Sequence, residues 1–122
     1  NAGKKVLDAV IAKQVLSMME SVVKPGGTGT QAAITGYRVA GKTGTARIAG
    51  KHGYKEKRYV ASFAGIAPAS KPRLVVAVVI HEPTRGSYYG GRVAAPLFSK
   101  VMGAALRMLD IEPDDAVEVQ PS

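Results

Sequence analysis

Cysteine and tryptophan are absent from this sequence, and aromatic residues make up only 6% of it. Without cysteine the chain can form neither a disulfide framework nor a thiolate metal site, and a cysteine nucleophile is excluded within it. The two histidines, His52 and His81, do not stand at the spacing that zinc ligands need. We therefore expect no metal site and no cofactor.

Long hydrophobic runs are also missing. The longest uninterrupted apolar run, from Leu74 to Ile80, is far shorter than the roughly 20 residues that cross a bilayer as a helix. The chain begins neither with methionine nor with the charged-then-apolar stretch of a signal peptide. We therefore expect a piece of a longer protein, and any membrane anchor of that protein would lie outside this sequence.

Acidic residues are few, because nine Asp and Glu face 17 Lys and Arg among 122 residues, for a formal net charge of +8. Such a balance favours anionic partners, namely nucleic acid, acidic lipid headgroups or substrates that carry a carboxylate. Much of the excess lies in residues 47–58, where a solvated loop is the plain interpretation. Only Tyr54 and Tyr59 interleave with it, which is a thin stacking platform for a nucleic-acid-binding module.

Apolar spacing predicts a helix near each end of the chain. The first runs from Asp8, whose carboxylate can cap it, to Val23, and the breaker Lys24-Pro25-Gly26-Gly27 ends it. The second runs from Val93 to Leu109, with Pro96 expected in its first turn. The side chains expected to be buried are Val15, Met18, Met19, Val22 and Val23 on the first helix, and Leu97, Phe98, Val101, Met102, Ala105, Met108 and Leu109 on the second.

Three short strands are predicted between the helices, at Tyr37–Ala46, Tyr59–Ile66 and Leu74–Ile80. A Gly- and Thr-rich connection precedes them and looks too small and polar to join the core. The turn at 68–72 is so short that the last two strands must pair antiparallel, and the β-branched third strand is expected to be buried on both faces. The result is an α+β fold in which helices flank an antiparallel sheet. Residues 1–111 should form this unit, and the acidic tail 112–122 should be flexible.

One motif suggests a nucleotide site. Residues Gly36 to Thr43 match the phosphate-loop pattern G-x-x-x-x-G-K-[ST]. Its mechanism requires a strand before the first glycine and a helix that begins at the lysine. The glycines at 44, 50 and 53 would each destabilise such a helix by roughly 1 kcal/mol relative to alanine. The context disfavours a phosphate loop. A nucleotide site nevertheless stays an alternative to the interpretation of the overlapping motif that follows.

The overlapping triplet Lys42-Thr43-Gly44 matches the K-T-G element of penicillin-recognising serine acyl-transferases, whose companions are S-x-x-K and S-x-N. On a strand that lines a cleft, the Lys42 ammonium supplies positive potential, and the hydroxyls of Thr43 and Thr45 can bind a substrate carboxylate. Gly44 leaves room for a ligand, and the Thr45 amide can point at a developing oxyanion. A three-residue motif alone is equally compatible with an ordinary exposed lysine.

A wider pattern distinguishes these possibilities. Three blocks, Gly36–Arg47, Ser62–Pro68 and Tyr88–Phe98, follow one another in the order found in one enzyme family. From Met18 to Leu109 the chain resembles the C-terminal part of class B penicillin-binding proteins, the monofunctional peptidoglycan D,D-transpeptidases. Among these it is most similar to the division-specific members of Gram-negative bacteria.

The resemblance implies the C-terminal part of a transpeptidase fold of the serine β-lactamase type. Lys42, Thr43 and Gly44 would lie on the third strand of a five-stranded sheet beside the acyl-enzyme serine, and Thr45 would supply an oxyanion amide. The residues implied to bind substrate or β-lactam are Thr43, Thr45, Arg47, Tyr59, Tyr88 and Tyr89.

The implied partners are a stem peptide ending in D-Ala-D-Ala, β-lactam antibiotics, the upstream remainder of the same protein and membrane proteins of the division machinery, with no nucleic acid. The implied location is the periplasmic face of the inner membrane, reached through an N-terminal anchor outside this sequence. There the parent enzyme would cross-link stem peptides during septal wall synthesis. Whether it also acts as a carboxypeptidase is left open.

The nucleophile of such an enzyme is not expected in this chain. Ser21-Val22-Val23-Lys24 fits S-x-x-K formally, but it falls at a helix end and runs into Pro25-Gly26-Gly27, so we interpret it as a decoy. No S-x-N element is present, because the sole asparagine is Asn1. The acyl-enzyme serine should therefore lie upstream, and the fragment alone should be inactive.

Overall fold

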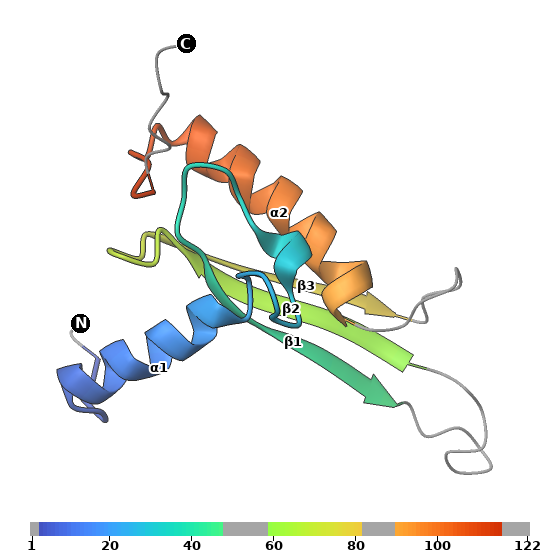
Figure 1. Cartoon of the computed structure of the whole chain (residues 1–122), viewed down its shortest axis with the longest axis horizontal. Coiled ribbons are helices and arrows are strands. Elements are labelled where there is room, and N and C mark those ends of the chain that lie inside the picture. Colours follow the sequence, from blue (N-terminus) through green and yellow to red (C-terminus); the bar gives the residue numbers. More distant parts are fainter. Residues whose placement is uncertain (1–2, 48–58, 82–89, 116–122) are drawn as a thin grey trace.

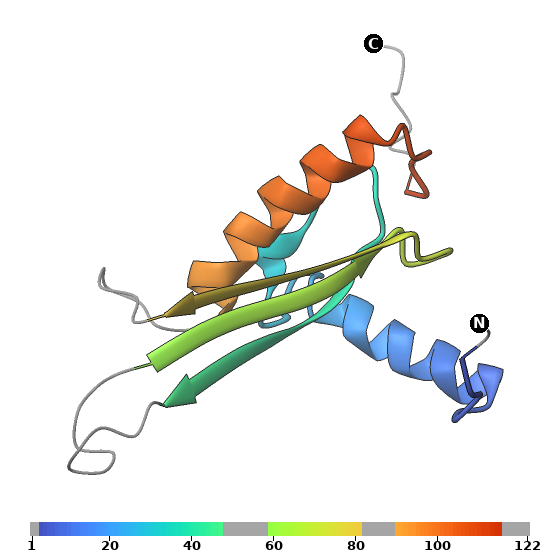
Figure 2. The same cartoon turned by 180° about the vertical axis from the view of Figure 1, so that it is seen from behind.

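The computed structural model describes residues 3–47, 59–81 and 90–115. In chain order its elements are α1 (Ala9–Ser21), a 3-10 turn η1 (Thr30–Ala32), β1 (Ala40–Arg47), β2 (Tyr59–Ala67), β3 (Leu74–His81) and α2 (Gly90–Met108). Helix α2 lies along one face of the sheet, and α1 lies on the opposite side next to β1 (Figures 1 and 2). The predicted α+β class and order of helices and strands are confirmed.

Helix α1 begins where the sequence predicts. The Asp8 carboxylate accepts a hydrogen bond from the Val10 amide at 3.0 Å and so satisfies one of the amides that a helix leaves unpaired in its first turn. The predicted breaker ends the helix, and Gly26 adopts a φ of 90°, which glycine tolerates without strain. The amide of Gly29 then donates to the Val22 carbonyl at 2.9 Å and folds the turn back onto the helix end.

The three strands form one antiparallel sheet in the order β1-β2-β3. The predicted pairing of the last two strands is therefore confirmed. The sheet has three strands within the described residues, and the five-stranded sheet implied by the resemblance stays a prediction about the whole domain.

The core lies between the sheet and α2. Ala61, Phe63 and Gly65 alternate along β2 and are buried, as their spacing predicts. The Phe63 and Phe98 rings are fully buried, with centroids 4.6 Å apart and planes tilted by 54°. A Cβ at Gly65 would lie 2.6 Å from Phe98 Cζ, so glycine at this position lets the ring rest directly against the strand.

Some of the predicted buried faces are wrong. On α1, Val15 and Met18 are exposed, because among the described strands only β1 contacts this helix. On α2 the apolar face is rotated from the prediction, since close contact with a sheet selects small side chains beside a few large ones. The side chains of α2 that are fully buried are Ala94, Ala95, Phe98, Met102 and Leu106, whereas Leu97, Val101, Met108 and the following Leu109 are exposed.

Strand β3 is buried on one face only, contrary to the prediction. Val75 and Val79 are 75% and 55% exposed, while Val78 on the other face is buried. Helix α2 covers the face that carries Val78, and no described element packs against the opposite face. The continuous β-branched run therefore predicted the strand correctly but not its surroundings.

Two short segments also differ from their predictions. Helix α2 begins at Gly90, so Pro96 lies beyond the first turn. The first turn of α2 contains Gly91, where a Cβ would lie only 1.9 Å from the Thr28 carbonyl oxygen, so glycine is necessary for this close approach. Ala32, in the connection expected to be too small and polar for the core, is fully buried.

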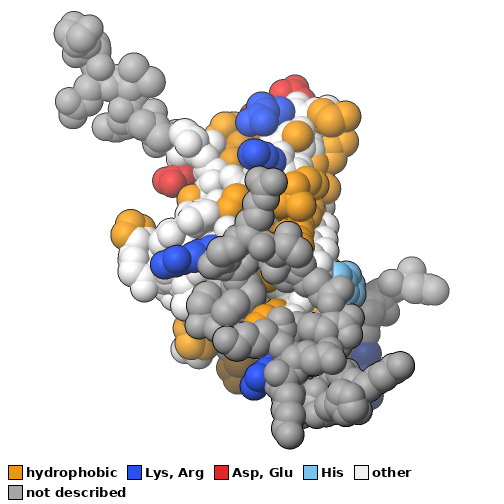
Figure 3. All heavy atoms as spheres, turned by 90° about the vertical axis from the view of Figure 1, so that its right-hand side faces the viewer, with side chains coloured by type: hydrophobic (Ala, Val, Ile, Leu, Met, Phe, Trp, Pro, Cys, Tyr) orange, Lys and Arg blue, Asp and Glu red, His pale blue; other side chains and the backbone are white. Residues whose placement is uncertain are grey.

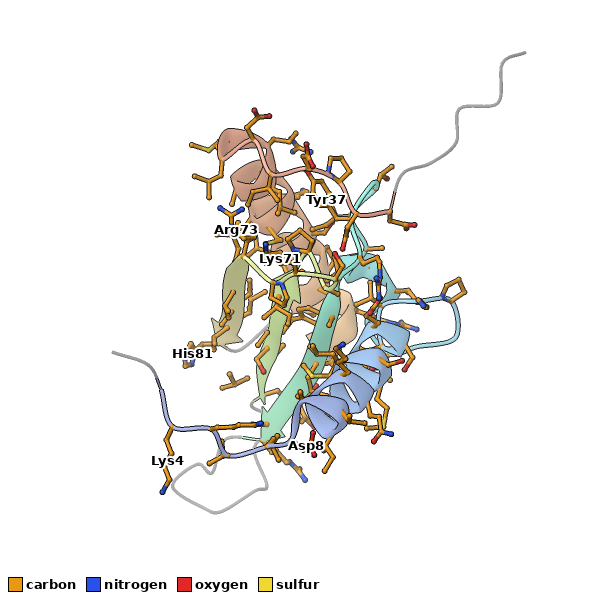
Figure 4. The ribbon with its side chains drawn as sticks, turned by 90° about the vertical axis from the view of Figure 1, so that its left-hand side faces the viewer. Lys4, Asp8, Tyr37, Lys71, Arg73 and His81 are labelled. Carbon is orange, nitrogen blue, oxygen red and sulfur yellow. The ribbon has the colours of Figure 1, made fainter. Side chains whose placement is uncertain are left out.

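The start of the C-terminal tail is attached to the body of the protein. The Tyr37 hydroxyl donates to the Ile111 carbonyl, and the Asp115 amide donates to the Gly36 carbonyl at 3.1 Å. Figure 4 shows Tyr37 beside the C-terminal segment. Residues 112–115 are thus tied down, residues 116–122 lie outside the described residues, and the predicted division at residue 111 stays a prediction.

Asp114 joins this tail to two distant segments. Its carboxylate accepts hydrogen bonds from the Arg38 amide at 2.7 Å, from the Ser70 amide at 3.2 Å and from the Ser70 hydroxyl at 2.7 Å. Partial burial alone would raise the pKa of the Asp114 carboxyl, but these hydrogen bonds favour the charged form and lower the pKa below 3.8. The carboxylate therefore stabilises the fold while it is ionised.

We expect Asp114→Asn to destabilise the transpeptidase domain at neutral pH, because it weakens the hydrogen bonds that the carboxylate accepts. The expected loss is only roughly 1 kcal/mol, since the carboxylate is partly solvated. Because the folded pKa lies below the unfolded one, this stabilisation is present above pH 3.8 and is lost as the pH falls through the folded pKa. Urea unfolding of both proteins at several pH values should show the difference shrinking in acid. Asp115→Asn is the matched control, and a pH-independent difference would contradict the assignment.

Candidate active site

The K-T-G triplet lies on β1, one of the two outer strands of the described sheet. Cross-strand partners fix its register: Lys42 lies opposite Ala64, and Thr43 lies opposite Phe63. Lys42 is therefore in a strand, and no described helix begins at this position. The phosphate-loop alternative is not supported, because the described residues that follow Lys42 continue the strand and provide no helix N-terminus to receive a phosphate.

Side chains on β1 alternate between the two faces of the sheet. Thr43 shares the face of Phe63 and α2, whereas Lys42 and Gly44 lie on the opposite face. A Cβ at Gly44 would lie 2.4 Å from the hydroxyl oxygen of Ser62, so the missing side chain makes room for the neighbouring strand.

The exposed Lys42 ammonium donates to the Thr43 carbonyl oxygen at 2.8 Å. In an antiparallel strand, the amide and carbonyl of one residue point to the same side, and residues two apart share that direction. The Thr45 amide therefore points to the same side of β1 as the carbonyl that accepts Lys42. A cationic group and a backbone donor line this side of the strand.

The structure describes two of the other four predicted binding residues. Arg47 and Tyr59 are cross-strand partners at the end of the β1-β2 pair where Thr45 also lies, so the structure brings them near the motif. Figure 3 looks at the molecule from this side and shows Lys and Arg side chains on the described part of the surface. Tyr88 and Tyr89 lie outside the described residues.

An ion pair that the sequence did not reveal fixes the approach to β1. The guanidinium of Arg38 donates to Glu20 Oε1 at 2.7 Å and to Glu20 Oε2 at 3.1 Å, and the Glu20 side chain is only 8% exposed. The hydrogen bond and charge of Glu20 raise the pKa of Arg38 further above its ordinary value. The pair ties the last turn of α1 to the segment that leads into the motif strand.

The formal S-x-x-K match does not form a reactive pair. Ser21 is the last residue of α1, and its hydroxyl donates to the Met18 carbonyl of the same helix. Such a bond is common for serine near a helix end and leaves the hydroxyl turned toward backbone. The Ser21 hydroxyl is therefore bonded within its own helix.

The described helices include none long and apolar enough to cross a membrane. No three His, Cys, Asp or Glu side chains gather as a metal site in residues 3–47, 59–81 and 90–115.

Comparison with known proteins decides the family. The sequence model described as penicillin binding protein transpeptidase domain matches residues 1–103. The chain belongs to this transpeptidase family. The nucleic-acid-binding alternative finds no support in these similarities.

Curated and solved relatives agree with this family. The chain is 52% identical over 112 residues to the peptidoglycan D,D-transpeptidase FtsI of Escherichia coli K12, covering 92% of this chain and 19% of that protein. It is 49% identical to the probable peptidoglycan D,D-transpeptidase PenA of Neisseria gonorrhoeae, covering 91% and 19%.

A solved transpeptidase domain of penicillin-binding protein 3 from Burkholderia pseudomallei superposes with a TM-score of 0.83 at 48% identity, covering 92% of this chain and 34% of that one. The chain thus spans about a fifth of the curated transpeptidases it matches, for example 19% of FtsI.

Proposed function

We propose that the protein containing this chain is a serine peptidoglycan D,D-transpeptidase, and that this chain supplies its Lys-Thr-Gly strand. The observation that carries the proposal is the placement of Lys42, Thr43 and Gly44 on an outer strand of a transpeptidase-family sheet, with the Lys42 ammonium exposed. The reaction is acyl transfer: a serine attacks the D-Ala-D-Ala end of a stem peptide, releases D-Ala and passes the acyl group to an amine.

Each motif residue has a chemical task in this proposal. The Lys42 ammonium supplies a positive potential for the substrate carboxylate and for hydroxyl proton transfer beside the serine. The Thr43 and Thr45 hydroxyls donate hydrogen bonds to the carboxylate, because an ionised carboxylate can only accept. The Thr45 amide stabilises the oxyanion of the tetrahedral intermediate. Arg47, Tyr59, Tyr88 and Tyr89 contribute to binding of the acyl donor.

The setting follows from the relatives and is part of the proposal. FtsI of Escherichia coli, the relative named above, is called a peptidoglycan D,D-transpeptidase. We infer that the parent of this chain acts in septal wall synthesis at the periplasmic face of the inner membrane, with an N-terminal anchor and division proteins as partners. β-Lactams, which resemble the D-Ala-D-Ala end, would acylate the same serine and inhibit the enzyme.

Incubation of the complete protein with a fluorescent penicillin tests the function. We expect one covalent label per molecule, a mass increase equal to the penicillin, and loss of labelling after heat denaturation. Intact-mass and peptide mapping should place the label on a serine upstream of this chain. A native protein that takes up no label would overturn the proposal.

The decoy motif offers a separate prediction. Ser21→Ala in the complete protein should leave the rate of penicillin labelling unchanged within about twofold, because the Ser21 hydroxyl bonds to the Met18 carbonyl of its own helix. Stopped-flow acylation of mutant and wild type measures this. If labelling vanished while the protein stayed folded, Ser21 would be the nucleophile after all.

A further inference from the structure

The turn after α1 reaches the motif strand at one point. Thr28 Oγ1 lies 3.3 Å from Thr43 Oγ1, and either hydroxyl can be the donor. This contact joins an exposed residue of a glycine-rich turn to the middle residue of the K-T-G triplet. Sequence patterns give no fixed spacing for such a residue, and the sequence predicts only a connection for its segment.

The turn that carries Thr28 is held on several sides. The Gly29 amide donates to the Val22 carbonyl at 2.9 Å, which fixes the turn to the end of α1. A Cβ at Gly29 would lie 2.9 Å from the Phe63 ring and 3.3 Å from Thr43 Cγ2. The Thr28 carbonyl oxygen in turn abuts Gly91 at the start of α2. The Thr28 hydroxyl is therefore presented to Thr43 from a fixed backbone.

We propose that Thr28 is a positioning residue for the carboxylate subsite, acting through the hydroxyl of Thr43. The inference rests on the proposed transpeptidase function. A hydroxyl has one proton to donate and two lone pairs that accept, whereas a carboxylate only accepts. When a ligand carboxylate binds, the Thr43 hydroxyl donates its hydrogen bond to that carboxylate, and the Thr28 hydroxyl then becomes the donor to Thr43 Oγ1.

This direction of hydrogen bonding makes the effect of Thr28 depend on the ligand. A donor behind Thr43 orients its hydroxyl and polarises it, which strengthens the bond to an anion. When the ligand carboxylate is esterified, no anion fixes the direction of the hydrogen bond between Thr28 and Thr43. The contribution of Thr28 to the acylation rate then falls. Thr28 therefore favours ligands with a free carboxylate.

The test compares Thr28→Val, which keeps the shape and removes the hydroxyl, with Thr28→Ser, which keeps the hydroxyl, in the complete protein. The readout is the second-order rate constant of acylation by benzylpenicillin and by its methyl ester. For benzylpenicillin we expect Thr28→Val to be slower by roughly threefold to tenfold, the range of one neutral hydrogen bond. Thr28→Ser should stay within about twofold of wild type, and the methyl ester should react equally with all three proteins.

A double mutant shows whether the effect passes through Thr43. Thr28→Val added to Thr43→Val should cause no further loss, because the two residues act as one unit. An equal loss with both ligands, an additive double mutant or an unchanged Thr28→Val each overturns the inference. Should Thr28→Val fail to fold, Thr28→Ala and Thr28→Ser carry the same comparison. A wild type that resists both ligands points instead to failure of the proposed function.

Discussion

Replacing Lys42 with alanine in the complete protein should slow acylation by a fluorescent penicillin by about a hundredfold or more, the loss typical of removing a preorganised electrostatic group. The ammonium lies beside the Thr43 carbonyl, on the side of β1 toward which the Thr45 amide points. Its loss removes a positive charge from the side of the strand where we propose that the carboxylate and oxyanion bind. The measurement is the second-order acylation rate constant.

Matched variants separate this effect from a general loss of charge. Lys42→Arg keeps the charge but changes its geometry, so its rate should fall between those of wild type and Lys42→Ala. Lys100→Ala removes an exposed lysine from α2 and should leave acylation unchanged. Equal acylation rates in wild type and Lys42→Ala would remove Lys42 from the proposed site.

The sequence predicted the elements well because local signals mark them. Asp8 caps α1 as its position suggests, and Pro68 and Pro72 fall in the connection between β2 and β3. These features depend on residues close together in the chain. The K-T-G triplet was found for the same reason, since its chemistry needs three consecutive residues on a strand.

Burial was predicted less well because it depends on what packs against an element. The β-branched side chains of β3 are typical of a strand covered on both faces, yet Val75 is 75% exposed within the described chain. On α2 the apolar periodicity predicted that Leu97 and Val101 are buried, whereas they are exposed and Ala94 and Ala95 are fully buried. No periodicity analysis of a single helix specifies how closely a sheet approaches it.

The contacts that support the site were missed because they join distant segments. Glu20 and Arg38 pair across the junction of α1 and β1, and Thr28 meets Thr43 across a turn. None of these residues stands in a motif of fixed spacing. Such pairs become visible only once the chain is folded, since each combines two ordinary residues.

Replacing Phe63 with alanine should cost about 3–5 kcal/mol, the range for a large aromatic side chain removed from a core. The ring is fully buried, lies 4.6 Å from the Phe98 ring and sits directly opposite Thr43 on the neighbouring strand. Because the free energy of unfolding of such a domain is only about 5–15 kcal/mol, this substitution should remove a large part of it. Urea unfolding of the complete transpeptidase domain measures the change.

Phe63→Ala should also impair the proposed active site. A Cβ at Gly41 would lie 2.5 Å from Phe63 Cζ, so the ring supports β1 directly next to Lys42. We expect the folded fraction of Phe63→Ala to be acylated more slowly than wild type, and Phe63→Leu, which leaves a smaller cavity, to lose less on both measures. Combining Phe63→Ala with Phe98→Ala should cost less than the sum of the two, because the rings contact each other. A loss below about 1 kcal/mol for Phe63→Ala would show that this ring is not the centre of the core.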